Sequence, residues 1–177
     1  MAKRGYDRDT IRGGASDWDV SRPFSSYLRQ LGSLIAHPVR FYEVLPKVQD
    51  PRAPGLFLAF SGIFTAIVWF FFWGWLAALL GLLLAIPASL VFAGVCYVGA
   101  FGGRYEYLIT WRAMSYPFGF ALPFLAVPAL RWFVLVVFLF LIAGVGLRTV
   151  QEVPVVRAFL ASFVASAIVG AGLFFFG

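Results

Sequence analysis

Ionisable residues are scarce in this sequence, and their scarcity excludes an ordinary soluble domain. Only 12% of the 177 residues are charged, whereas a soluble domain has about a quarter. Between Leu56 and Gly103 there is no Asp, Glu, Lys, Arg or His. Hydrophobic residues make up 62% of the chain, and the mean hydropathy is +0.88. Because a chain of this size leaves roughly a third of its surface exposed, most of that surface is expected to contact lipid.

Residues that commonly perform catalysis or bind metals are also rare. His37 is the only histidine, and no cluster of ligating residues at metal-site spacing surrounds it. Cys96 is the only cysteine, which excludes a disulfide framework; we interpret it as a small packing residue. No ionisable residue falls near the middle of an apolar segment, where a proton relay or ion-coupled transport would need one. We therefore expect no enzyme activity, no cofactor and no metal.

The longest apolar segment is too long for one membrane crossing. Leu56–Phe101 contains 46 residues, about 69 Å as a single helix against a hydrocarbon core of roughly 30 Å. The segment must turn back, and Trp73-Gly74-Trp75 offers two interfacial tryptophans around a helix-weakening glycine. This predicts a first span over Leu56–Trp73 and a second over Leu76–Val98.

Three further spans are predicted after this pair. The third, Ala113–Ala129, contains Pro117, Pro123 and Pro128 and is expected to be broken or strongly bent, after an interfacial stretch at residues 105–112. The fourth, Trp132–Leu147, is only about 24 Å long and would need a thin patch of bilayer, with a polar loop after it. The fifth, Val155–Phe176, follows Pro154, which suits the first turn of a helix.

The distribution of cations supports five spans. With the N-terminus in the cytoplasm, every one of the 14 Lys and Arg residues except Arg131 lies on the cytoplasmic side, as the positive-inside rule expects. Merging the first two spans would move most of the later arginines outside. We therefore predict an all-α polytopic membrane helical bundle with its C-terminus outside.

An amphipathic segment precedes the first span. Apolar residues recur at spacings of three and four over Phe24–Ala36, which predicts a helix in the headgroup region or against the bundle. His37-Pro38 ends it, residues 38–48 form a second interfacial helical turn, and residues 51–55 are predicted to be a linker. Residues 1–23 are predicted to be a disordered tail. The chain thus divides into a tail (1–23), an interfacial segment (24–55) and a five-span domain (56–177). The candidate interfacial or partner-binding residues are Phe24, Tyr27, Leu28, Leu31, Ile35, Phe41 and Tyr42.

The proline-rich third span offers another interpretation. Helices interrupted within the membrane line the substrate sites of some transporters, so Tyr116, Pro117 and Pro123 are candidates for a pathway. A packing kink explains the same prolines equally well.

Two short segments resemble the Yip domain (Ypt-interacting protein) family. His37–Leu45 (HPVRFYEVL) is similar to the P-x-x-F-[FY]-x-x-[LV] entry of that domain. Gly102–Tyr107, followed by Ala113–Pro117 and a span ending at Pro123, resembles its third-span region. The resemblance covers Pro38 to the C-terminus. It implies a five-span bundle with a cytosolic N-terminus, and eukaryotic members are associated with Rab GTPases and vesicle traffic.

The sequence also departs from those eukaryotic members. Their acidic D-L-x-G-P motif is replaced by Pro51-Arg52-Ala53-Pro54-Gly55, and the tail is short. Arginine outnumbers lysine twelve to two, which favours a prokaryotic member in the cytoplasmic membrane.

The leading functional hypothesis is a non-enzymatic membrane protein that binds partners or organises the bilayer. A small transporter or channel subunit and an accessory subunit of a larger membrane complex are the alternatives. The expected partners are lipid and another membrane protein or a second copy. Nucleic acid is not expected, because the basic residues are dispersed among acidic ones.

Overall fold

The described part of the chain is entirely helical. The computed structural model describes Trp18 and residues 21–47, 49–101 and 103–176, and no strand occurs among them. The helices are α2 (Pro23–Ala36), α3 (Pro38–Val44), α4 (Arg52–Trp73), α5 (Trp75–Gly99), α6 (Tyr107–Phe124), α7 (Pro128–Val134), the π-helical η1 (Leu135–Ile142), α8 (Ala143–Gln151) and α9 (Val155–Phe176).

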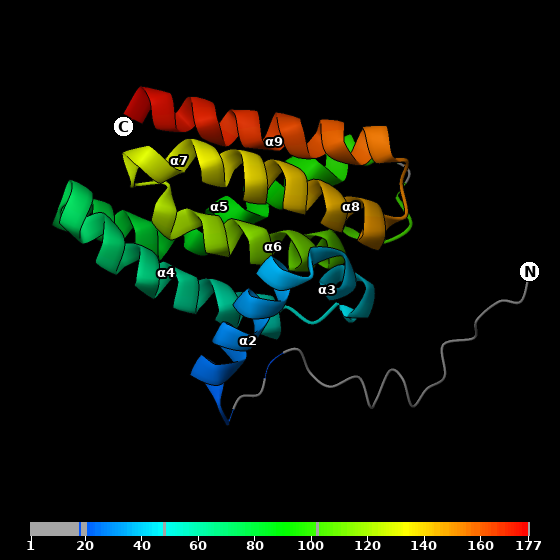
Figure 1. Cartoon of the computed structure of the whole chain (residues 1–177), viewed down its shortest axis with the longest axis horizontal. Coiled ribbons are helices and arrows are strands. Elements are labelled where there is room, and N and C mark those ends of the chain that lie inside the picture. The colour runs from blue at the N-terminus through cyan, green and yellow to red at the C-terminus, as the bar shows by residue number, and fades with distance from the viewer. Residues whose placement is uncertain (1–17, 19–20, 48, 102, 177) are drawn as a thin grey trace, which may run out of the picture.

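Four helices are long and apolar enough to cross a membrane. They are Arg52–Trp73, Trp75–Gly99, Pro128–Gln151 and Val155–Phe174, the third of which joins α7, η1 and α8 without interruption. These helices lie side by side, and α6 runs among them between the same two ends of the bundle (Figure 1). The chain is therefore a membrane protein built as a helical bundle.

The first two predicted spans form the expected hairpin. Helix α4 ends at Trp73, Gly74 makes the turn with φ +86° and ψ −176°, and α5 begins at Trp75. This backbone conformation is available almost only to glycine. The predicted linker at residues 51–55 is wrong, because α4 already begins at Arg52, whose N–H donates to Asp50 Oδ1 at 2.9 Å.

Helix α6 differs from the predicted third span in position and shape. It begins at Tyr107 rather than Ala113, so most of the stretch predicted to be interfacial is helix. It also continues without a break through Pro117 and ends just after Pro123. Helix α6 does not break at Pro117, because it is packed against α4, α5, η1 and α8, which hold it helical although Pro117 supplies no backbone N–H. The break expected within residues 113–129 lies instead at residues 125–127, between the end of α6 and the start of the next helix at Pro128.

The fourth predicted span is too short. Its helix runs from Pro128, in the first helical turn, to Gln151, so the four residues after Leu147 are helical and do not form a loop. Glu152 then ends the helix in a left-handed conformation with φ 56°. With 24 residues the helix needs no thinned bilayer. The fifth predicted helix, Val155–Phe176, matches α9.

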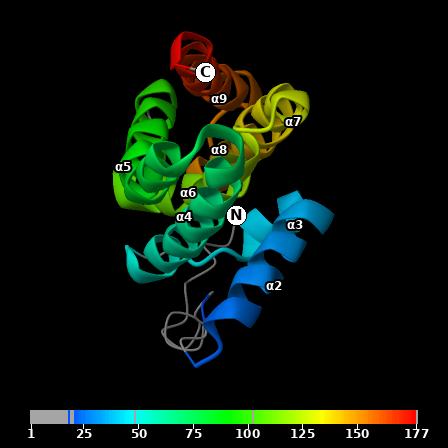
Figure 2. The ribbon, with the colours of Figure 1, turned by 90° about the vertical axis from the view of Figure 1, so that its left-hand side faces the viewer.

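Helices α2 and α3 lie outside the bundle. Helix α2 crosses α4 instead of running along it, and α2 and α9 are on opposite sides of the bundle (Figures 1 and 2). The bounds of α2 confirm the predicted helix before His37-Pro38. The predicted disorder of residues 1–23 falls largely outside the described residues, but it is wrong for Trp18, which is buried with its ring 5.7 Å from that of Phe60, and for Pro23, where α2 begins.

A substitution at the α4–α5 turn tests the hairpin. We expect Gly74→Ala to lower the midpoint of thermal unfolding in detergent, because a Cβ at positive φ costs about 1–3 kcal/mol. Gly55→Ala is the matched control, since Gly55 lies in a helix with ordinary φ and nothing within 4 Å of an added Cβ. Equal midpoints for the two variants would contradict a turn that depends on positive φ at Gly74.

Candidate functional site at the α2–α3 surface

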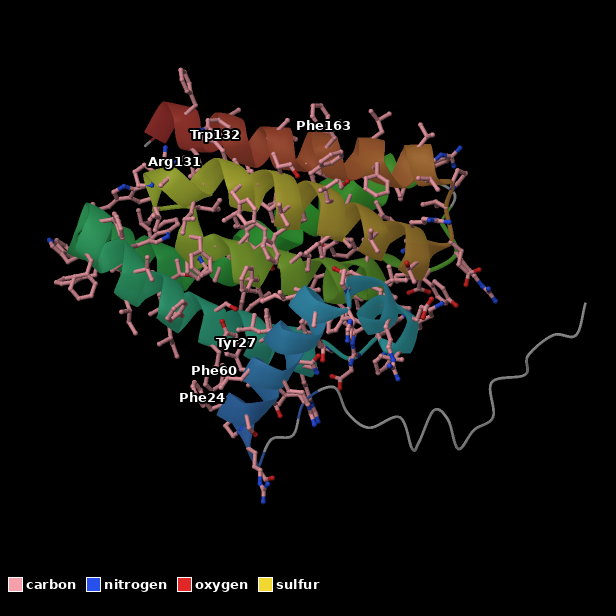
Figure 3. The ribbon with its side chains drawn as sticks, in the orientation of Figure 1. Phe24, Tyr27, Phe60, Arg131, Trp132 and Phe163 are labelled. Atoms are coloured by element: carbon pink, nitrogen blue, oxygen red, sulfur yellow. The ribbon has the colours of Figure 1, made fainter. Side chains whose placement is uncertain are left out.

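Tyr27 fixes α2 to the bundle. Its ring lies 5.1 Å from that of Phe57 and 5.9 Å from that of Phe60, both in α4. Figure 3 shows Tyr27 and Phe60 together where α2 crosses α4. Ser61 Oγ donates a hydrogen bond to the Tyr27 hydroxyl at 3.4 Å. Burial raises the pKa of Tyr27, and the bond from Ser61 opposes that rise only in part. Tyr27 is therefore a packing residue and stays neutral at physiological pH.

Phe41 and Tyr42 fix α3 to α6 and α8. The Phe41 ring meets Tyr116 of α6 edge-on, with centroids 5.1 Å apart. Tyr42 is fully buried against Gly146 of α8, where an added Cβ would lie 2.5 Å from the ring. Among the described residues its hydroxyl has no hydrogen-bond partner, and burial raises its pKa. Gly146 is thus required because the Tyr42 ring occupies the space of a side chain.

The apolar stripe of α2 is divided between two environments. Tyr27 and Leu34 face the bundle and are buried. Phe24, Leu28 and Ile35 are 62%, 50% and 52% exposed. At about 100° per residue these three share an arc of roughly 40°, beside the buried arc and away from the polar positions. Helix α2 therefore has three sides: one against protein, one apolar and exposed, and one polar.

Basic side chains lie near α2, on its polar side and on α3. Arg22, just before α2, Arg29 on α2 and Arg40 on α3 are all exposed. Arg29 lies about 100–140° round the helix from the apolar row. Helix α3 adds the exposed apolar residues Val39 and Val44. A helix with an exposed apolar row and arginines on its polar side is the arrangement that binds the boundary between anionic headgroups and acyl chains.

The predicted candidates thus separate into groups. Tyr27, Phe41 and Tyr42 are buried in contacts with the bundle, and Leu31 is partly buried against the core. Only Phe24, Leu28 and Ile35 are accessible to a membrane or partner. The pathway candidates Tyr116, Pro117 and Pro123 are all buried within α6. Spacing along α2 indicated the stripe, but it could not show which part of the stripe the bundle covers.

Arg112 is a residue whose role the sequence did not indicate. A position near the end of a predicted span suggests a side chain that reaches the headgroups, but Arg112 is 3% exposed, in the second turn of α6. Its Nη1 lies 3.5 Å from the backbone oxygen of Asp50, in the connection between α3 and α4. The buried guanidinium of Arg112 therefore helps to hold the connection between α3 and α4 against α6.

A network of polar side chains lies at the α3 end of the bundle. Arg104 Nη1 and Lys47 Nζ lie 2.7 and 3.4 Å from the two carboxylate oxygens of Glu152. The hydrogen bond from Arg104, helped by Lys47, lowers the pKa of Glu152. Because the Arg104 and Glu152 side chains are exposed, their contribution to stability is small. Buried beside them, the Gln151 side chain accepts from the Tyr105 N–H at 2.9 Å and donates to the Tyr105 carbonyl at 3.0 Å.

The described residues offer no metal centre. No group of three or more His, Cys, Asp and Glu side chains among them is placed to hold an ion.

Comparisons with known proteins gave no relative: no family model, no curated protein and no solved structure matches this chain. The resemblance to the Yip domain family stays a prediction based on short motifs. In the structure the first of these motifs forms α3, and the second leads into α6.

The contact between Tyr42 and Gly146 can be tested directly. We expect Gly146→Ala to lower the unfolding midpoint in detergent, because the added methyl overlaps the Tyr42 ring and such overpacking costs about 1–3 kcal/mol. Gly32→Ala, at an open position on α2, should have no such effect. Tyr42→Phe should be neutral or stabilising, because it removes a buried hydroxyl without a partner among the described residues. A large loss of stability in Tyr42→Phe would contradict this account.

Proposed function

We propose that this chain is a non-enzymatic membrane protein that organises the cytoplasmic leaflet by inserting one side of α2 into it. The observation that carries the proposal is the exposed row Phe24, Leu28 and Ile35, which lies beside the face that packs on the bundle. A helix on a membrane protein surface can present such a row to the acyl boundary while its polar side remains in water.

The proposal includes a fifth crossing by α6. This helix has 18 residues, about 27 Å, and runs between the same two ends as the four apolar helices (Figure 1). Nearly all its side chains are buried, so Thr110, Arg112 and Ser115 need not face lipid. Its low hydropathy is therefore compatible with a crossing, because protein surrounds it on most sides.

The proposed orientation places α2 and α3 in the cytoplasm. Arg104, Arg148 and Arg157 lie at the bundle end near α3, and Arg131 lies at the end where α4 turns into α5. The positive-inside rule assigns the first end to the cytoplasm. Each exposed arginine near an anionic surface adds about 1 kcal/mol of attraction, so Arg22, Arg29 and Arg40 would hold α2 in the headgroup region.

Insertion from one side has a physical consequence for the bilayer. A helix buried about 5–10 Å deep occupies area among the headgroups of one leaflet only. The bundle fixes α2 through Tyr27 and Leu34, so the inserted row cannot leave without moving against α4. We propose that this fixed insertion expands the cytoplasmic leaflet locally, in keeping with the resemblance to the Yip domain family.

Another membrane protein could cover the same row. An accessory-subunit role would place a partner helix against Phe24, Leu28 and Ile35 in place of lipid. A transporter would instead use Tyr116, Pro117 and Pro123, and their close packing in α6 gives that alternative no support. Lipid is favoured because Arg22, Arg29 and Arg40 are exposed and complementary to anionic headgroups.

Site-directed labelling tests where α2 lies. In a Cys96→Ala background, a fluorophore on Leu28→Cys is compared with one on Ser33→Cys, on the polar side of the same helix. In vesicles of phosphatidylcholine and phosphatidylglycerol, we expect lipid brominated high in the acyl chain to quench the first label and aqueous iodide to quench the second. Equal iodide quenching at both positions would exclude insertion.

The effect on the bilayer needs its own measurement. Vesicles of the same composition with wild-type protein should be smaller or more tubular by electron microscopy than vesicles with the Phe24→Ser, Leu28→Ser, Ile35→Ser variant, because serine cannot replace the buried apolar area. Ser33→Ala is the control and should behave as wild type. If all three preparations have the same morphology as protein-free vesicles, the leaflet role is wrong.

A further inference from the structure

Helices α5 and α9 touch at one end and leave a cleft at the other. At the α3 end, Gly99 lies so close to α9 that an added Cβ would be 2.6 Å from Ala161 Cβ. Towards the opposite end an apolar cleft of about 660 Å³ lies between the two helices. Its walls include Leu84 and Ala88 of α5 and Ile168 and Leu173 of α9. Figure 2 looks at the molecule from this end.

The cleft has the dimensions and chemistry of a site for a long apolar chain. Along α5 its lining extends from Ala77 to Val95, about 27 Å, close to the thickness of the hydrocarbon core. Phe118 and Leu122 of α6 form the floor. The indole N–H of Trp69, also in the lining, already donates to the Leu122 carbonyl at 3.1 Å. Its volume is within the usual range for small-molecule sites, about 300–1,000 Å³.

A cation lies beside one end of the cleft. The guanidinium carbon of Arg131 is 6.0 Å from the ring centre of Trp73, which lines the cleft. Arg131 Nε is buried and has no hydrogen-bond partner among the described residues. In the sequence Arg131 is the only Lys or Arg between Arg112 and Arg148. The Arg131 side chain as a whole is only partly buried, and a guanidinium group matches the geometry of phosphate oxygens.

We propose that the cleft binds one acyl chain of a glycerophospholipid and that Arg131 holds the phosphate of the same lipid. Both walls belong to helices that can cross a membrane, so the cleft opens to the hydrocarbon. The apolar lining then contacts the chain, while the partly exposed Arg131 side chain contacts the phosphate. The bound lipid belongs to the leaflet opposite α2, so this site is separate from the proposed action of α2.

A phospholipid fits better than a second copy of this chain. No Asp or Glu occurs between Glu106 and Glu152, so a parallel copy would bring no acidic side chain of that region to Arg131. The phosphate supplies the missing anion, and an acyl chain from one leaflet, which spans about half of the hydrocarbon core, fits within the length of the cleft. Charge complementarity at Arg131 therefore selects the lipid.

Native mass spectrometry tests the site. Protein is purified in mild detergent, stripped of lipid and titrated with phosphatidylglycerol. We expect one tightly bound lipid per wild-type chain and about tenfold weaker binding to Arg131→Gln, the loss expected for a charge-assisted hydrogen bond. Arg148→Gln, at the other end of the bundle, is the matched control and should bind as wild type. Inorganic phosphate should not compete.

A second variant separates the cleft from the cation. Ala88→Phe places a ring in the cleft and should abolish tight binding while leaving Arg131 intact. Unchanged affinity in both Arg131→Gln and Ala88→Phe would overturn the proposal, as would a wild-type protein that forms dimers and binds no lipid. Thermal unfolding in detergent checks that each variant is folded, and the lipid should raise the wild-type midpoint but not that of Ala88→Phe. None of these readouts depends on insertion of α2.

Discussion

The organisation of this protein depends on keeping α6 away from lipid. In hydrocarbon every polar group must be satisfied by protein, and an unsatisfied group costs several kcal/mol. Helix α6 contains Thr110, Arg112 and Ser115, and Pro117 leaves a turn of its backbone without one hydrogen bond. The more apolar helices α4, α5 and η1, together with α8, pack around it. The apolar excess of the sequence is thus largely the outer surface of a bundle whose centre is more polar.

The sequence predicts the parts of this fold that depend on local rules. Length and the Trp-Gly-Trp pattern locate the α4–α5 hairpin, and Pro154 precedes α9 as expected. The rules fail where tertiary packing overrides them. Three prolines predict a break in the third span, but neighbouring helices keep α6 continuous past Pro117, and the break falls between Phe124 and Pro128. The polar residues around Arg148 predict a loop, but Gln151 bonds to the Tyr105 backbone and extends the helix to that point.

The candidate surfaces were predictable only in part. Periodicity identifies the apolar stripe of α2, but the crossing of α2 over α4 decides that Tyr27 is covered and Leu28 is not. The cleft between α5 and α9 gives no local signal, because it arises from the way two distant helices diverge from the contact between Gly99 and Ala161. Arg131 is visible in the sequence as an isolated cation, yet its buried Nε and its place beside Trp73 required the structure.

Helix α6 separates the two proposed lipid contacts. The Tyr116 ring contacts the rings of Phe41 in α3 and Phe57 in α4, on the side of α6 that faces the interfacial helices. Phe118, about 200° further round the helix, forms part of the floor of the cleft. Because a packed helix with no break lies between them, rearrangement at one surface has no mobile segment through which to reach the other. Changes at Leu28 and at Arg131 should therefore have additive effects on stability, as expected for distant sites without shared partners. A measured coupling between them would mean that α6 moves as lipid binds.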